Sequence, residues 1–158
     1  MSEKKKLEPL IRQLVAWMNA ELAERRIIVK DLQEDLYDGQ ILGMLLDKLT
    51  GESAVPEPPL GLGEVSKKQK LRTVLDRANQ LMGVQAVKWK LDSIYDKDLI
   101  SLLHLLVAIV RFFGVVAVRL PEDLSVKVIV IQKKRQLEKV TVVEKITGGV
   151  AEAKKKGK

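Results

Sequence analysis

Apolar side chains are densest between residues 98 and 113, where DLISLLHLLVAIVRFF is apolar at nearly every position. A helix that is apolar on all sides is a buried helix. Asp96 is a suitable N-cap, and Gly114 stands where a left-handed C-terminal cap is favoured. Polar positions such as His104 and Arg111 keep the run short of the roughly 20 apolar residues of a membrane span. We therefore predict that this segment is the central core helix of a globular domain.

Three other segments repeat apolar residues at intervals of three and four, which predicts amphipathic helices packed around the central one. Pro9 falls in the opening turn of the first segment, and Trp17 is expected to anchor it to the core. The second segment is interrupted at Asp38-Gly39, where Asp38 is a candidate N-cap, and Gly83 closes the third. The segments cover residues 7–25, 32–51 and 67–81.

The remaining stretches lack the spacing of an amphipathic helix. Residues 52–64 hold three prolines and two glycines, which predicts a surface loop, and residues 84–94 are expected to form an extended connection or a short turn. In residues 126–131 and 140–143 the β-branched composition favours strands, whereas the position in the chain favours a helix. We slightly prefer a strand or hairpin there. Residues 148–158 have nothing to bury and are expected to be disordered.

Composition narrows the class of protein. With 158 residues and 46% hydrophobic content, one domain is expected. The net charge of +7 is uneven, because residues 1–119 carry 18 basic and 16 acidic side chains and residues 120–158 carry 10 and 5. This asymmetry favours an acidic partner, such as nucleic acid, an anionic membrane face or a negatively charged filament. A solubilising tail on a neutral domain explains the charge equally well.

Candidate chemistry is sparse. The single histidine, His104, lies within the central helix and is interpreted as a packed, hydrogen-bonded core residue. Without cysteine, the usual transition-metal ligand sets are missing, and Leu36 stands where a calcium loop needs an oxygen ligand. Asp96 and Asp98 resemble capping charges rather than an acid/base pair. We predict no enzymatic activity, no metal site and no cofactor.

The sequence also bears on nucleic-acid binding and on location. Aromatic residues make up only 4% of the chain, so we do not expect it to bind nucleic acid by stacking on the bases. The N-terminal residues lead into amphipathic sequence rather than a purely apolar run, which argues against a signal peptide and favours a location inside the cell.

In its order of segments the chain resembles the calponin-homology domain. The matching features are Trp17, LYDGQILGMLLDKLTG at 36–51, KQKLRTVLDRANQLM at 68–82, and Asp92-Ser93-Ile94 before the central helix. Within that family the sequence is most similar to the first such domain of the parvins. That similarity continues through RLPEDLSVKVIVIQKKRQLEKVTVVEKITG at 119–148.

The resemblance implies an all-α fold, a single helical domain without catalytic activity that serves in cytoskeletal attachment or scaffolding. The expected divisions are a basic N-terminal tail at 1–6, the calponin-homology domain at 7–120, a parvin-like C-terminal extension at 121–147, and a disordered basic tail at 148–158.

We expect a cytoplasmic, cytoskeletal module that docks a basic surface on an acidic filament. Tandem domains of this family usually bind actin strongly and single ones bind microtubules, so tubulin, in a microtubule or in the axoneme of a cilium or flagellum, is slightly preferred over actin. The alternative is an actin-binding or parvin-like adhesion adaptor for protein partners, which would use an apolar groove or the edge of residues 126–131. The candidate filament-binding residues are Lys67, Lys68, Lys70, Arg72, Lys133, Lys134, Arg135, Lys154, Lys155, Lys156 and Lys158.

Overall fold

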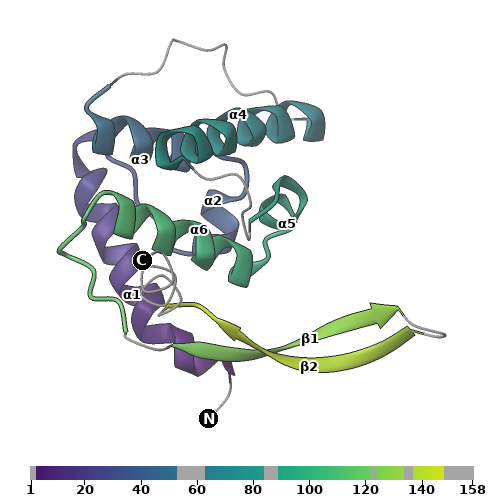
Figure 1. The fold of residues 1–158 in the computed structure, drawn as a ribbon. Helices are drawn as coiled ribbons and strands as arrows, with labels where there is room; N and C mark the ends of the chain where they lie inside the picture. Colours follow the sequence, from purple (N-terminus) through teal and green to yellow (C-terminus); the bar gives the residue numbers. More distant parts are fainter. Residues whose placement is uncertain (1–2, 53–62, 84–88, 122–123, 134–136, 148–158) are drawn as a thin grey trace.

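Helices form the body of the molecule, and one β-hairpin extends from it (Figure 1). The computed structural model describes residues 3–52, 63–83, 89–121, 124–133 and 137–147. This arrangement confirms the helical domain, and it also confirms the preference for a hairpin over a helix near the C-terminus. The elements are α1 (Glu3–Glu21), the 3-10 turn η1 (Ala23–Arg25), α2 (Leu32–Leu36), α3 (Gln40–Thr50), α4 (Glu64–Met82), α5 (Leu91–Tyr95), α6 (Leu99–Phe112), β1 (Ser125–Lys133) and β2 (Leu137–Lys145).

The predicted central helix is α6, and every residue from Ser101 to Val107 is buried. Its N-cap is Asp98, whose carboxylate accepts hydrogen bonds from the Ser101 N–H (3.4 Å) and Oγ (2.6 Å). The prediction of Asp96 as N-cap is wrong because the preceding residues form the short helix α5, which ends at that aspartate. Gly114 has a φ of +61°, as a left-handed cap requires.

Helices α1, α3 and α4 pack around α6 and share one leucine-rich core with it. Trp17 is buried, which confirms its predicted role as an anchor. Helix α1 begins at Glu3 rather than at Leu7, so Pro9 lies inside the helix and not in its opening turn. The predicted end of the third amphipathic segment is confirmed, because the Gly83 N–H donates to the carbonyls of Asn79 and Gln80.

The turn between α2 and α3 requires a glycine. Gly39 has a φ of +82°, and a Cβ atom built there would lie 2.8 Å from the Cα atom of Leu71 in α4. Asp38 accepts a hydrogen bond from the Gln40 N–H at 3.1 Å, although the N-cap position of α3 is Gly39, one residue later than predicted. The missing side chain at this turn allows α3 and α4 to approach closely.

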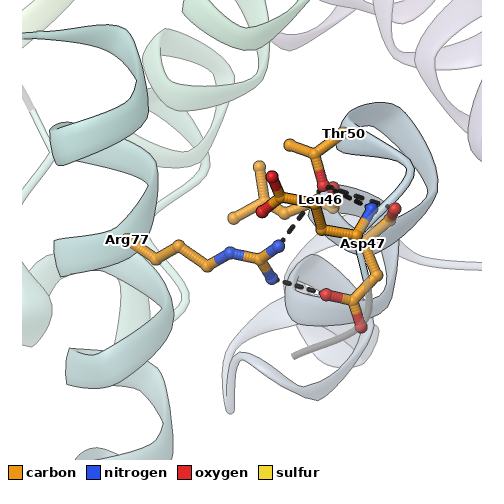
Figure 2. A network of polar contacts seen from close by, with 5 residues as sticks. Leu46, Asp47, Thr50 and Arg77 are labelled. Carbon is orange, nitrogen blue, oxygen red and sulfur yellow. Dashed lines mark hydrogen bonds and ion pairs between the residues drawn. The ribbon is translucent and has the colours of Figure 1, made fainter. Parts of the chain in front are cut away.

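A polar network then joins α3 to α4 (Figure 2). Nη1 of Arg77 donates to Oδ1 of Asp47 at 2.6 Å, and Nη2 lies 3.4 Å from Oγ1 of Thr50. The Thr50 hydroxyl donates to the Leu46 carbonyl at 2.8 Å, which orients it toward the arginine. Arg77 of α4 is therefore a structural tie between two helices.

The hairpin is attached to the helices at its base. β1 and β2 pair antiparallel, from Ser125 opposite Lys145 to Lys133 opposite Leu137. Val126 and Ile146 are buried in the core, and β1 packs against α1. Nε2 of His104 lies 2.8 Å from Oε1 of Glu144 in β2, so the histidine is hydrogen-bonded as predicted, and its partner comes from the hairpin.

Candidate functional site

Four candidate filament-binding residues lie in the first half of α4. Lys67, Lys68 and Lys70 are half-buried, and Arg72 is exposed. The first two reach across to two tyrosines at the ends of the short helices, Tyr37 after α2 and Tyr95 in α5. Together with Lys97, which precedes α6, these side chains form what we call the lysine-tyrosine cluster: Tyr37, Tyr95, Lys67, Lys68 and Lys97.

The two rings of the cluster meet edge to face, with centroids 5.4 Å apart. Nζ of Lys67 donates a hydrogen bond to Oη of Tyr37 at 2.9 Å. Nζ of Lys68 lies 5.1 Å from the centroid of the Tyr95 ring, and Nζ of Lys97 lies 4.8 Å from that of Tyr37. These distances are within the range of cation-π attraction, so the rings hold three ammonium groups close together at the surface.

Two of these ammonium groups are stabilised in their charged form. The hydrogen bond to Tyr37 raises the pKa of Lys67 above its ordinary value of 10.5. The pKa of Lys97 is raised chiefly by its hydrogen bond to Glu34, whose Oε2 lies 2.9 Å from the lysine Nζ. Both lysines are therefore fully charged at neutral pH.

The backbone at Lys97 positions its side chain. The residue has a φ of +66°, a region that non-glycine residues rarely occupy. Its carbonyl accepts a hydrogen bond from Nε2 of Gln33 at 2.8 Å, which ties the turn before α6 to α2. Strained backbone of this kind occurs at sites where the direction of a side chain matters.

Sequence reasoning missed Tyr37, Tyr95, Lys97 and Glu34. The sequence does contain a repeated pattern at the two tyrosines of the chain. Each tyrosine stands at the end of a short helix and is followed by an aspartate, and the residue after the aspartate has a positive φ. Tyr37-Asp38-Gly39 and Tyr95-Asp96-Lys97 are two copies of one turn. The ion pair between Glu34 and Lys97 joins residues far apart in the chain, so no local pattern could reveal it.

The other candidate residues are not brought together with this cluster by any described contact. Lys133 is the last residue of β1, opposite Leu137 in β2. The remaining six lie outside the described residues, and so does most of the predicted loop at 52–64. The six are Lys134, Arg135, Lys154, Lys155, Lys156 and Lys158.

The structure was searched for groups that could hold a metal ion and for helices that could span a membrane. Within the described ranges, no three His, Cys, Asp or Glu side chains are grouped so that they could hold a metal ion. Over the same ranges, no helix has the length and apolar character needed to cross a bilayer. The lysine-tyrosine cluster instead offers fixed positive charges beside aromatic edges, an arrangement suited to an acidic protein surface.

Comparison with known proteins gives a consistent result. A family model of the calponin homology (CH) domain matches residues 8–114. Human beta-parvin is 42% identical over 137 residues, which cover 85% of this chain and 37% of that protein. Human gamma-parvin is 37% identical over 145 residues, 90% of this chain and 43% of that protein.

A nematode protein is also similar to most of this chain. Paralyzed arrest at two-fold protein 6 of Caenorhabditis elegans is 36% identical over 155 residues, 96% of this chain and 41% of that protein. The chain thus spans less than half the length of these relatives. All three alignments are longer than the segment matched by the family model, so the likeness includes residues outside 8–114.

Proposed function

The chain belongs to the calponin homology domain family, and from this premise we propose that it is a non-enzymatic, cytoskeletal adaptor of the parvin type that links protein partners to actin filaments. The observation that carries the proposal is the extent of the likeness to parvins, which covers 85% of the chain for beta-parvin and 90% for gamma-parvin. Nothing in that likeness favours a microtubule or an axoneme, which the sequence led us to prefer.

In this proposal the first half of α4 supplies the docking surface. Lys68 lies over the Tyr95 ring and Arg72 is exposed one turn further along the helix. Charges held in place by rings lose less side-chain entropy on binding than mobile ones. We propose that the basic residues at 133–135 and 154–158 also contribute to filament binding. The proposal keeps the division into a domain at 7–120 and an extension at 121–147.

Co-sedimentation of the full chain with actin filaments and, separately, with microtubules tests the proposal. We expect pelleting with actin that weakens from low to physiological salt, because exposed charges are screened. The variant K68Q/R72Q should lower the affinity several-fold. The matched control K30Q/K90Q removes the same charge from two other exposed positions and should leave affinity unchanged.

The other outcomes are decisive as well. Pelleting with microtubules alone would overturn the actin assignment and restore the preference drawn from the sequence. Pelleting with neither filament would leave an adaptor that binds only protein partners. An equal loss for both variant pairs would show that overall charge, and not the surface of α4, governs binding.

A further inference from the structure

The chain that leaves α6 presents apolar side chains to solvent. It runs along the edge of the helical body before it reaches β1 (Figure 1). Phe112 is 51% exposed, Val116 is 92% exposed, and Ala117 is also exposed. We call residues 111–119 the RFFGVVAVR segment. Apolar side chains gathered at a protein surface often mark a place where another molecule binds.

Contacts with the helices hold the backbone of the RFFGVVAVR segment in place. The Val115 N–H donates to the Val110 carbonyl at 3.0 Å, which closes the end of α6. The side chain of Gln13 in α1 accepts from the Arg119 N–H at 2.7 Å and donates to the Arg119 carbonyl at 3.1 Å. Val118 is buried in the helical core. A partner that binds here would therefore not have to order a loop, which lowers the entropic cost of binding.

An arginine stands at each end of the segment. Arg111 is half-buried and Arg119 is exposed. Neither guanidinium forms an ion pair or a hydrogen bond with any residue that the structure describes. Burial lowers the pKa of Arg111 below its ordinary value, although the guanidinium stays charged at neutral pH. A partly desolvated charge without a counter-charge is unfavourable, so Arg111 would gain from a carboxylate that a partner supplies.

The sequence around these arginines is free of other charged residues. Residues 99–121 contain no aspartate, no glutamate and no lysine. The planar guanidinium matches a carboxylate with two parallel hydrogen bonds. Arginine and aromatic residues are enriched at protein interfaces and lysine is depleted there, whereas surfaces that bind anionic bilayers use lysine and arginine alike. The composition of the segment therefore favours a protein partner over a lipid surface.

A simpler role for Arg111 would be to stabilise the end of α6. The residue lies in the last turn of that helix, where a positive charge interacts favourably with the helix dipole. That role accounts for a basic residue at this position. It accounts neither for the exposed side chains of Phe112 and Val116 nor for the second arginine in the loop that follows.

We propose that the RFFGVVAVR segment docks a segment of another protein in which acidic side chains flank apolar ones. The carboxylates would pair with Arg111 and Arg119, and the apolar side chains would cover Phe112 and Val116. Phe112 packs edge to face on Phe113, with ring centroids 5.0 Å apart, so it offers a fixed aromatic surface. The inference rests on the proposed adaptor function, because it names the surface for a protein partner, and its residues lie outside α4.

Selection from random peptides displayed on phage, with the full chain as bait, tests the assignment. We expect the selected peptides to carry aspartate or glutamate beside leucine, isoleucine or phenylalanine. A synthetic copy of the most enriched peptide is then titrated by fluorescence anisotropy. Arg111→Met should weaken its binding about tenfold or more, as the loss of a central interface arginine does. Arg25→Met, at an exposed arginine in η1, is the control and should leave the affinity unchanged.

Two substitutions at Val116 separate charge from apolar contact. Because this side chain is 92% exposed, neither Val116→Asp nor Val116→Lys should alter the fold. Both remove the same apolar side chain, so the difference in affinity between them reports the charge of the bound peptide. We expect the peptide to bind Val116→Lys about fivefold or more tightly than Val116→Asp. Equal affinities would contradict an acidic partner.

Thermal unfolding distinguishes a docking arginine from one that only stabilises the helix. Arg111→Met should keep or raise the unfolding midpoint, because it removes a partly desolvated charge that no described carboxylate offsets. A lower midpoint together with unchanged peptide affinity would show that Arg111 serves only the end of α6, and it would overturn the assignment.

The remaining outcomes separate this surface from other binding sites. Selection that enriches no peptide, or only peptides without acidic residues, would overturn the assignment. So would binding to vesicles of phosphatidylserine and phosphatidylcholine that is lost in Val116→Asp, or actin pelleting that is lost in the same variant. The proposed actin binding fails or holds independently, because K68Q/R72Q should weaken actin pelleting and leave peptide affinity unchanged.

Discussion

The helical domain and the hairpin are held in different ways. In the helices, fully buried leucines such as Leu14, Leu45 and Leu103 come from three separate elements and share one core. In the hairpin, the described core contacts are confined to the base, where Val126, Ile146 and the His104–Glu144 pair meet the helices. Stability in the first region is spread over many contacts, whereas the position of the second depends on few.

The largest expected effect comes from the core. Leu103 is 0% exposed in the middle of α6, so Leu103→Ala should lower the free energy of unfolding by about 2–5 kcal/mol. Thermal unfolding followed by circular dichroism would measure it. Val116→Ala, at a residue 92% exposed, is the control and should change the midpoint little. A small loss for Leu103→Ala would mean that the helical core is loosely packed.

The second largest effect is expected from the ion pair between Arg77 and Asp47 in the helical domain. Arg77 and Asp47 have side chains 25% and 15% exposed, so their pair is only partly screened by water. Arg77→Met should lower the unfolding free energy by about 1–3 kcal/mol, because it leaves a half-buried carboxylate with fewer partners. A double-mutant cycle with Asp47→Asn isolates the coupling. Additive losses would contradict a direct interaction.

The contact between His104 and Glu144 should stabilise the hairpin and not the helices. Glu144→Gln removes the charge that faces His104, and we expect a loss of about 0.5–1.5 kcal/mol in the docking of the hairpin. Native-state hydrogen exchange should show faster exchange in β1 and β2 while amides of α6 keep their protection. Thr141→Val, an exposed change in the same strand, is the control. Equal acceleration in α6 would show that the two regions unfold together.

The smallest effect concerns pH. The folded-state pKa of Lys97 lies above its ordinary value of 10.5, so the charged lysine stabilises the fold below that pH, and this contribution is lost as pH rises through the folded-state pKa. Lys97→Met should therefore unfold earlier in guanidinium than the unaltered chain at neutral pH, and equally at strongly alkaline pH. A difference that persists after the lysine has lost its proton would assign the effect to packing instead.

The comparison also explains what could be predicted from sequence. The long helices were predictable because leucines recur with helical spacing, and the strands because valine and isoleucine dominate residues 126–131 and 140–143. The start of α6 could not be predicted, because Asp96 and Asp98 are both possible N-caps. The choice between them depends on whether Leu91–Tyr95 forms a helix of its own. The local sequence pattern therefore predicts which elements form, whereas their exact boundaries depend on the elements next to them.

The candidate site was less predictable than the fold. The sequence indicated that Lys67 and Lys68 were surface charges, but not that each contacts a tyrosine at the end of a short helix. Nor did the sequence indicate that Arg77 of α4 binds Asp47 of α3. Such pairings depend on which helices meet, and charge patterns along one segment carry no information about that.

The base of the hairpin also has a mechanical consequence. The Leu124 N–H donates to Oγ1 of Thr147 at 2.8 Å, and the Leu124 carbonyl accepts from the Ile146 N–H at 2.8 Å, so the chain enters and leaves the hairpin at one point. Tension applied across that point loads these bonds before any pair further out. The strands would then part in sequence from the base to the tip, as a zipper does, and the hairpin would lengthen under force while the helices stay folded.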